Sequence, residues 1–444
     1  SLCPRSARDK PSFKINHYMY PNLYYAFKDI FGVEWHWLRI FNSFGFFVAI
    51  AFIAGAIVLT KELRRKERDG LMVHTEETIM VGRPASMVEL LINFILGFLL
   101  GYKIIGLFTA DAELTKDPQS FIFSSEGNLP AGLVLGLLLA GLKWYEKNKQ
   151  KLAKPEQRKI RIWPHDRVGD MVIFAAVFGF LGAKIFHNLE NWDELVRNPI
   201  ESLLSFSGLT FYGGLLCAGL AIAYYAKRHK IGFWHLGDAI APALMIAYAI
   251  GRLGCQVSGD GDWGILNSAY VTELPGKSVP ADSATFQRVL IENRDLYNKQ
   301  FNNQPAQYAS VKAPSFLPDW TVAYSYPHNV INEGIRIKDC NDDHCSVLPI
   351  PVFPTPFYET LVCGIFFFFL WGIRKRIEVP GIIFGIYMIL NGIERFLVEK
   401  IRVNTQYNIL GFQPTQAEII SFLLVLAGVL IIIFKRRQAA KVVA

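Results

Sequence analysis

Residues 41–68 read FNSFGFFVAIAFIAGAIVLTKELRRKER, an apolar run of about twenty residues that ends in five basic side chains. An α-helix of that length crosses the roughly 30 Å hydrocarbon core of a bilayer. Basic residues at one end of such a helix favour the cytoplasmic side of the membrane. This stretch therefore predicts a membrane-spanning helix that starts outside the cytoplasm and ends inside it.

The same kind of apolar run occurs nine times along the chain. The runs lie near residues 40–60, 88–109, 129–145, 169–188, 208–226, 236–256, 355–373, 381–399 and 417–434. The composition agrees, because 52% of the 444 residues are hydrophobic and only 19% are charged, against about 25% charged in a typical soluble domain. We therefore expect an all-α integral membrane protein with about nine transmembrane helices.

The basic residues predict the orientation of these helices. Short segments after the first, third, fifth, seventh and ninth runs hold 22 of the 46 Lys and Arg residues. Positive charge concentrates in cytoplasmic loops, so we expect the N-terminus outside and the C-terminus inside. The net charge of +8 then reflects topology, and we expect no nucleic-acid partner.

The expected organisation has four parts and one internal repeat. An extracytoplasmic segment (1–39) precedes helices one to six (40–256), an extracytoplasmic insertion (257–352), and helices seven to nine with a basic cytoplasmic tail (353–444). Residues 101–149 align without gaps to 182–230, which we interpret as a duplicated helical hairpin. Both copies enter the membrane in the same orientation, unlike the inverted repeats of many transporters, so we do not favour a transporter.

The long insertion is rich in Asn, Asp, Pro and Tyr, and loops of this length usually have a function. It contains Cys340 and Cys345. Outside the cytosol these two residues are expected to be able to form a disulfide. A metal site from Cys340, His344 and Cys345 is the alternative, but further ligands at suitable spacing are not evident.

Charged residues within the apolar runs are costly in a membrane and mark candidate sites. Arg252 is flanked by Gly251 and Gly254, which would let the backbone approach a ligand, and a guanidinium suits a lipid phosphate. Arg395 and Glu399 are four residues apart and share one helical face. Internal salt bridges, or snorkelling near helix ends, are the alternative. The other charged candidates in the runs are Lys103, Lys184, Asp238, Glu359 and Glu394.

A third segment, residues 208–215, contains Tyr212 followed by Gly213 and Gly214. Small residues of this kind allow two helices to pack closely. They would also expose Tyr212 beside an open backbone. Both interpretations stay open from the sequence.

At these segments the chain resembles the bacterial phosphatidylglycerol–prolipoprotein diacylglyceryl transferase family. The family shows Ser-Phe-His-Gly-Gly, Gly-Arg-x-Gly-Asn-Phe-x-Asn-Gly-Glu, His-Pro-x-Gln-Leu-Tyr-Glu and Phe-Arg-x-x-Val-Glu-x-x-Arg. The resemblance covers the first run and about residues 165–265 and 350–435. The matching positions are residues 210–214, 251–260, 353–359 and 394–402, with Lys184 in a fifth segment that is similar to the family's Gly-Ala-Arg.

The chain departs from the family pattern at several positions. The family's histidine, often proposed as catalytic, looks like Tyr212 here, and the histidine of its His-Pro motif looks like Phe353. Its two asparagines look like Cys255 and Ser258, and its glutamate looks like Asp260. Both arginines believed essential look retained, as Arg252 and Arg395. The phospholipid clamp therefore looks preserved while the proton-handling part is altered.

The resemblance implies transfer of the diacylglyceryl group of phosphatidylglycerol to the lipobox cysteine of a prolipoprotein. It implies a multi-pass protein of the bacterial inner membrane with its active site facing the outer leaflet. We expect Arg252, Arg395 and Tyr212 to be catalytic, with His187 and Asp260 as rival bases, and we expect no metal or organic cofactor. The expected phospholipid-binding residues are Lys184, Gly213, Gly214, Gly251, Gly254, Ser258, Asp260, Tyr358, Glu359 and Glu399. The alternative is a non-catalytic phospholipid-binding membrane protein derived from this family.

Overall fold

The computed structural model describes residues 19–109, 121, 124–204, 210–301, 303–403 and 414–443. Each of the nine apolar runs contains helix, which confirms an all-α membrane protein. The helices of the runs are α2 (Ser43–Arg68), α3 (Met87–Leu99) continued by η2 (Leu100–Ile105) and α4 (Gly106–Thr109), α6 (Leu129–Lys149), α7 (Val168–Glu190), α10 (Phe211–Arg228), α11 (Phe233–Ser258), α14 (Thr355–Ile373), α15 (Ile382–Glu399) and α16 (Gln416–Val443).

Within the described residues, seven helices are long and apolar enough to cross a membrane by length and composition. The two 18-residue helices α10 and α15 are not among the seven. α15 carries Glu394, Arg395 and Glu399, so its charge content resembles that of a site more than that of a lipid-facing span. The nine-span topology and its orientation stay predictions.

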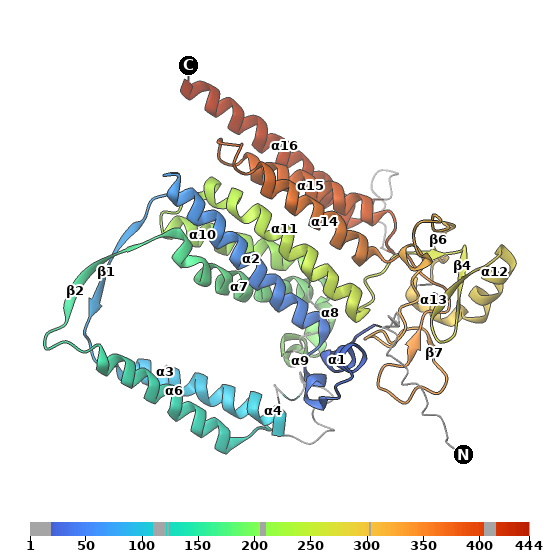
Figure 1. Cartoon of the computed structure of the whole chain (residues 1–444), viewed down its shortest axis with the longest axis horizontal. Coiled ribbons are helices and arrows are strands. Elements are labelled where there is room, and N and C mark those ends of the chain that lie inside the picture. Colours follow the sequence, from blue (N-terminus) through green and yellow to red (C-terminus); the bar gives the residue numbers. More distant parts are fainter. Residues whose placement is uncertain are drawn as a thin grey trace, which may run out of the picture.

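The main bundle is built on α11, the most buried of the seven candidate spans. It packs against α2 on one side and α14 on the other, and α15 packs against α16 (Figure 1). Leu63 and Leu236 lie in the α2 contact, and Met245, Cys363 and Ile383 lie in the core formed with α14 and α15. The central position of α11 explains why its apolar character extends around most of its circumference.

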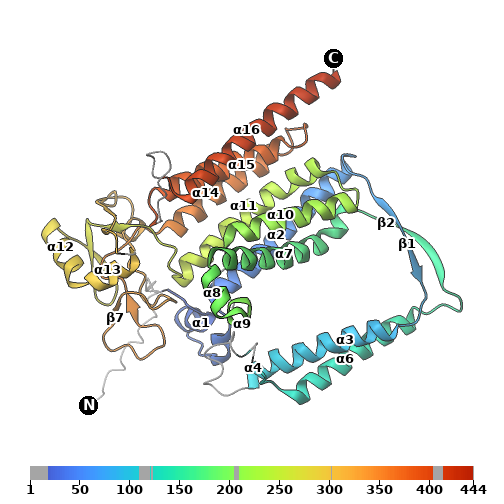
Figure 2. The same ribbon diagram turned by 180° about the vertical axis from the view of Figure 1, so that it is seen from behind.

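Two helical hairpins flank this bundle in different ways. α7 and α10 form one hairpin beside α2, whereas α3 and α6 form a second hairpin that Figures 1 and 2 show set apart from the bundle. Glycines that align in the repeat lie at a close contact between the two helices of each hairpin. A Cβ on Gly101 would lie 2.9 Å from Cα of Gly132, and a Cβ on Gly182 would lie 2.5 Å from the carbonyl oxygen of Gly213. This common geometry supports the interpretation of the repeat as a duplication.

A two-stranded antiparallel ribbon joins the separate hairpin to the bundle. It consists of β1 (Thr75–Val81) and β2 (Glu156–Ile162), and the sequence interpretation did not anticipate it. At the far end of the hairpin, the ring of Phe108 lies 6.4 Å from that of Trp37. Trp37 belongs to η1 (His36–Ile40), which follows the short helix α1 (Leu23–Phe31) within the expected extracytoplasmic segment. Residues 1–18 of that segment lie outside the described residues.

The insertion is a small folded lobe at the end of the bundle opposite the ribbon (Figures 1 and 2). Its core contains Trp263, Phe286, Tyr326 and Ile350, each 5% exposed or less. Cys340 and Cys345 form a disulfide, so the metal alternative for these cysteines is wrong. The elements of the lobe are β3 (Leu266–Asn267), β4 (Tyr270–Glu273), β5 (Lys277–Pro280), α12 (Ser283–Glu292), α13 (Arg294–Gln300), β6 (Tyr308–Ala309), η5 (Asp319–Thr321), β7 (Ile335–Arg336) and β8 (Ser346–Val347).

Three short helices complete the described fold between β2 and α10. They are η4 (Pro164–Arg167), α8 (Trp192–Arg197) and α9 (Pro199–Leu204).

Two charges that the sequence marked as candidate sites have structural roles instead. The Asp238 carboxylate accepts hydrogen bonds from the backbone amides of Gly381 (2.8 Å) and Phe384 (2.9 Å), and it therefore caps the start of α15. The Lys103 ammonium donates to the carbonyl oxygens of Phe121 (3.0 Å), Ser124 (2.5 Å) and Glu126 (2.7 Å). Lys103 thus holds the described residues 121, 124 and 126, which precede α6, in place.

Candidate active site

Helix direction brings the predicted arginines together at the end of the bundle that carries the insertion. Arg252 lies near the C-terminal end of α11, and Arg395 lies near the C-terminal end of α15. Glu359 lies near the N-terminal end of α14, which runs between them. Because α14 is antiparallel to its two neighbours, these three positions meet at one membrane level.

Glu359 is the centre of the cluster. Its side chain is completely buried and pairs with three guanidinium groups. Nε of Arg252 contacts Oε2, Nη1 of Arg395 lies 3.9 Å from Oε1, and Nη1 of Arg402 lies 3.7 Å from Oε1. A buried carboxylate needs such partners, because an unpaired charge in a low-dielectric interior is very costly. Glu359 therefore orients the arginines of three chain segments.

Asp262 bridges two of the same arginines from the solvent side. Its Oδ2 pairs with Nη1 of Arg252, and its Oδ1 lies 2.7 Å from Nη2 of Arg402. Burial raises the pKa of this carboxyl, but Arg402 and Arg252 more than offset that effect and hold the pKa below its usual value. Its side chain is 39% exposed. An ionised carboxylate thus occupies the accessible face of an arginine pair that would also suit a phosphate.

Arg395 and Glu399 lie on one face of α15 and form the internal ion pair that the sequence left as the alternative to a ligand contact. Nη2 of Arg395 lies 3.1 Å from Oε2 of Glu399, and the Glu399 side chain is 1% exposed. Glu394, immediately before Arg395, is 2% exposed. Neither of its carboxylate oxygens has a hydrogen-bond partner among the described residues. Glu394 is therefore a buried carboxyl group next to Arg395. Its two oxygens accept no hydrogen bond from the described residues.

Asp260 lies beside Asp262 in the loop that follows α11. Burial raises the pKa of Asp260, and the charge of Asp262 raises it further. Its Oδ1 accepts a hydrogen bond from the Asp262 backbone amide (3.3 Å). One possible ligand atom each from Cys255, Asp260 and Asp262 lies within 4.8 Å of the others. Asp262 is already held by two arginines, so we interpret this group as part of the anion site.

The insertion encloses this cluster through contacts on several sides. The Thr355 hydroxyl donates to the carbonyl oxygen of Asp262 (2.7 Å), and the Tyr358 hydroxyl donates to that of Thr321 (2.6 Å). The backbone amide of Ile265 donates to the carbonyl oxygen of Ile401 (2.9 Å), which positions the chain next to Arg402. Tyr358, predicted as a lipid contact, therefore connects α14 to the insertion.

The predicted glycines make mainly helix-packing contacts. A Cβ on Gly254 would lie 2.8 Å from Cβ of Phe47 on α2, and a Cβ on Gly213 would lie 2.4 Å from that of Phe186 on α7. A Cβ on Gly214 would lie 3.0 Å from the carbonyl oxygen of Gly179 on α7. Gly251 has open space where a Cβ would be. Of these four glycines, Gly251 alone has the open surroundings expected of a ligand contact.

The remaining predicted residues lie on other parts of the fold. Lys184 and His187 are on α7, and Tyr212 is in the first turn of α10. Lys184 is 5% exposed, and Ser258, at the end of α11, is fully buried. The ion pairs that join Arg252, Arg395 and Glu359 do not include these residues. Their participation in the site stays a prediction.

Sequence interpretation missed Asp262 and gave no role to Arg402. Asp262 is exposed enough to look like an ordinary loop acid, and nothing in its spacing from Arg402 indicates contact across 140 residues. The only available signal was its place two residues after Asp260 in the motif. The structure gives Arg402 a role through its pairing with Asp262.

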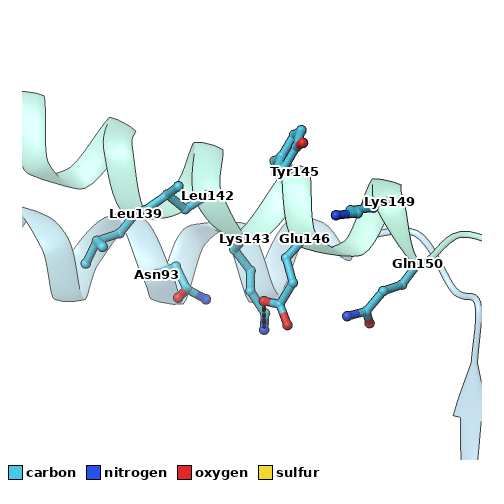
Figure 3. Close-up of a pocket in the computed structure, with 8 residues that line it drawn as sticks. All are labelled: Asn93, Leu139, Leu142, Lys143, Tyr145, Glu146, Lys149 and Gln150. Carbon is cyan, nitrogen blue, oxygen red and sulfur yellow. Dashed lines mark hydrogen bonds and ion pairs between the residues drawn. The ribbon is translucent and has the colours of Figure 1, made fainter.

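A cavity lies away from the arginine cluster, on the hairpin of α3 and α6 (Figure 3). It measures about 750 Å³ and includes a Lys143–Glu146 ion pair of 3.0 Å. Figure 3 shows Tyr145 pointing away from that pair. Its lining residues come from α3, α6 and the residue after α6, and none belongs to the arginine cluster. We therefore place the candidate active site at the arginines and not at this cavity.

The fold and the site define a class of protein: a polytopic helical membrane protein with a buried cluster of arginines and acids at one end of its bundle. The family model described as prolipoprotein diacylglyceryl transferase matches residues 130–434. The chain therefore belongs to the prolipoprotein diacylglyceryl transferase family, and it is a transferase.

Several curated relatives are named phosphatidylglycerol–prolipoprotein diacylglyceryl transferase. One from Leptospira interrogans serogroup Icterohaemorrhagiae serovar copenhageni is 25% identical over 368 residues, covering 70% of this chain and 91% of the relative. One from Shouchella clausii is 23% identical, covering 62% and 76%. One from Bacillus cytotoxicus is 26% identical, covering 69% and 87%. These similarities support the transferase prediction over the non-catalytic alternative.

Proposed function

We propose that this transferase moves the diacylglyceryl group of phosphatidylglycerol to the cysteine thiol of a prolipoprotein lipobox. The observation that carries the proposal is the cluster of Arg252, Arg395 and Arg402 around buried Glu359. Guanidinium groups fixed in this way suit a phosphodiester, because their geometry is set before the lipid arrives. The names of the relatives support the same two substrates.

In the proposed step, the thiolate sulfur attacks the diacylglyceryl carbon that bears the phosphate. The carbon–sulfur bond forms as the carbon–oxygen bond breaks, and glycerol 1-phosphate leaves with the bonding electron pair. Charge develops on the leaving phosphate, and Arg252 and Arg402 are placed to stabilise it once the phosphate displaces Asp262 from them. Arg395 remains anchored by Glu399 and directs its guanidinium toward the same centre.

The thiol proton needs an acceptor, because the thiolate is the nucleophile. Tyr212, His187 and Asp260 are the acceptors proposed from the sequence. Asp260 has the strongest geometric support, since it lies two residues from Asp262 and its elevated pKa makes it a better base than an ordinary aspartate. Arg252 also favours the thiolate through its charge. The site as proposed faces the outer leaflet of the bacterial inner membrane, next to the insertion.

The test is a transfer assay with purified protein in detergent, phosphatidylglycerol and a lipobox peptide with a free cysteine. The readouts are released glycerol phosphate and a peptide mass gain of one diacylglyceryl group. We expect Arg252→Ala and Arg395→Ala to lower the rate about 100-fold or more, as loss of a charge-stabilising donor does. Arg288→Ala, an exposed residue of α12, is the matched control and should leave the rate unchanged.

Two results would contradict the proposal. The first is transfer at the wild-type rate in the Arg252→Ala protein. The second is lipid binding by the wild type with no product mass gain under any condition, which would indicate a binding protein.

A further inference from the structure

A cationic cavity lies at the end of the bundle opposite the arginine cluster. It has a volume of about 650 Å³. It is formed by the C-terminal ends of α2 and α14 together with the start of η4. Arg374, one of its residues, follows Glu359 by 15 positions along α14, which corresponds to about 22 Å of helix. The lining residues are Lys61, Arg64, Arg65, Glu67, Arg68, Trp163, His165, Trp371, Arg374 and Lys375.

Two of the arginines are held in place by one buried acid. Glu62 is 1% exposed, and its carboxylate pairs with Nη2 of Arg65 (2.5 Å) and with Nε of Arg374 (2.8 Å). The Arg374 guanidinium also stacks 3.3 Å from the ring centroid of Trp371. Both arginines are therefore fixed in one geometry before any ligand binds, which reduces the entropy that binding would cost.

The other cations of the cavity are left with unbalanced charge. Lys61, Arg64 and Lys375 are exposed, and none has an ion-pair partner among the described residues. The single acid in the lining, Glu67, accepts a hydrogen bond from the His165 amide (2.9 Å) and contacts the His165 ring. Glu67 is thus already in use, and Asp69 beside the cavity is paired with Arg65 (2.6 Å), so the unpaired cations leave the cavity with a net positive charge.

The surface next to the cavity is apolar in the way that acyl chains require. Ile57 lies on the same face of α2 as Lys61 and Arg64, one turn toward the membrane centre, and it is 50% exposed. Phe368 lies one turn before Trp371 on α14 and is 71% exposed. Trp163 and Trp371 mark the level at which Trp commonly lies between lipid and water. A lipid bound here would place its headgroup in the cavity and its acyl chains against α2 and α14.

We propose that this cavity binds the phosphate headgroup of an anionic phospholipid, at the membrane surface opposite the active site. The shared chemistry is a phosphate anion, which a membrane lipid or free phosphate supplies. The adjacent exposed Ile57 and Phe368 favour the lipid. Basic pockets between membrane helices bind such headgroups in this way.

The test uses full-length protein in detergent and native mass spectrometry during titration with phosphatidylglycerol. We expect two lipid adducts for the wild type, one at each end of the bundle. The double variant Arg64→Ala with Lys375→Ala should bind the second lipid about thirtyfold more weakly, since each cation contributes about a factor of six. Arg436→Ala with Arg437→Ala is the matched control, because it removes two exposed charges from α16 outside the cavity and should bind like the wild type.

Unchanged binding of the second lipid in the Arg64/Lys375 variant would overturn the proposal. Binding of zwitterionic phosphatidylcholine as tightly as phosphatidylglycerol would also overturn it. In a second titration with inorganic phosphate, binding of phosphate without binding of the lipid would overturn it as well. Equal thermal unfolding temperatures of the two double variants would show that both are folded. The result does not depend on turnover, so it is distinguishable from failure of the transfer reaction.

Discussion

Asp260 and Asp262 are two neighbouring acids with opposite electrostatic environments. Arg402 and Arg252 keep the pKa of Asp262 low although burial opposes them, whereas burial and the charge of Asp262 raise the pKa of Asp260. Two carboxyl groups whose pKa values are driven apart commonly divide the work of a site. Asp262 is an internal counter-ion of the arginines, and we propose Asp260 as the group that exchanges a proton.

If Asp260 accepts the thiol proton, its ionised form is the active one. The rate should therefore rise with pH as Asp260 loses its proton, and the midpoint should lie above the ordinary aspartate pKa of about 3.9. Asp260→Asn should remove this acidic limb and lower the rate about 100-fold or more. The measurement is the pH dependence of glycerol phosphate release.

Asp295→Asn, an exposed residue of α13, is the control and should retain the wild-type pH profile. Superimposable profiles for the wild type and Asp260→Asn would exclude Asp260 as the base. Tyr212→Phe and His187→Ala would then be the next variants to measure.

Among the helices, the two hairpins depend on glycine at the points of closest approach. In α7, a Cβ on Gly182 would lie 2.4 Å from Cβ of Cys217 and 2.5 Å from the backbone oxygen of Gly213. Neither neighbour is the movable end of a flexible side chain. Close backbone approach at small residues is a main source of helix association in membranes. The hairpin contact is therefore intolerant of even one added methyl group.

Gly182→Ala should separate α7 from α10 and lower the free energy of unfolding by about 1–3 kcal/mol, the usual cost of overpacking. Gly219→Ala, on α10, is the matched control because nothing lies within 4 Å of the added Cβ. The measurement is thermal unfolding in detergent. Equal unfolding temperatures for the two variants would contradict this account of the hairpin.

In the molecule as a whole, the insertion and the β1–β2 ribbon lie at opposite ends of the bundle (Figures 1 and 2). The Cys340–Cys345 disulfide in the insertion fits an oxidising compartment. The basic cavity and the basic strand β2 lie at the other end, where the charge rule predicts cytoplasm. Both observations support the proposed orientation.

Single cysteines test that orientation. A membrane-impermeant maleimide added to intact cells should label Arg288→Cys in the insertion, and it should label Arg158→Cys in the ribbon only after permeabilisation. Both positions are exposed. Among the described residues, the three free cysteines lie within helices, and two of them are buried. Cys3 lies outside the described residues, so a Cys3→Ser protein is the background control. Labelling of Arg158→Cys in intact cells would reverse the topology.

Local sequence was sufficient to predict the apolar helices and several members of the site. A run of about twenty apolar residues has few alternatives in a membrane, because its backbone must satisfy its own hydrogen bonds. The i, i+4 spacing of Arg395 and Glu399 predicted that they share one helical face, because residues four apart are neighbours on a helix, and the structure adds their ion pair. The β1–β2 ribbon was missed, because its strands are short, exposed and separated by an entire hairpin.

The amino-acid sequence alone determined the membrane character, the helical runs and the identity of the charged residues within them, since each depends on neighbours within a few turns. Only the tertiary structure decided which charges meet. Asp238, an apparent site residue, caps α15, while Asp262 joins Arg252 to Arg402 from a loop. Such contacts connect residues as far as 143 positions apart, and they depend on how α11, α14 and α15 pack against one another.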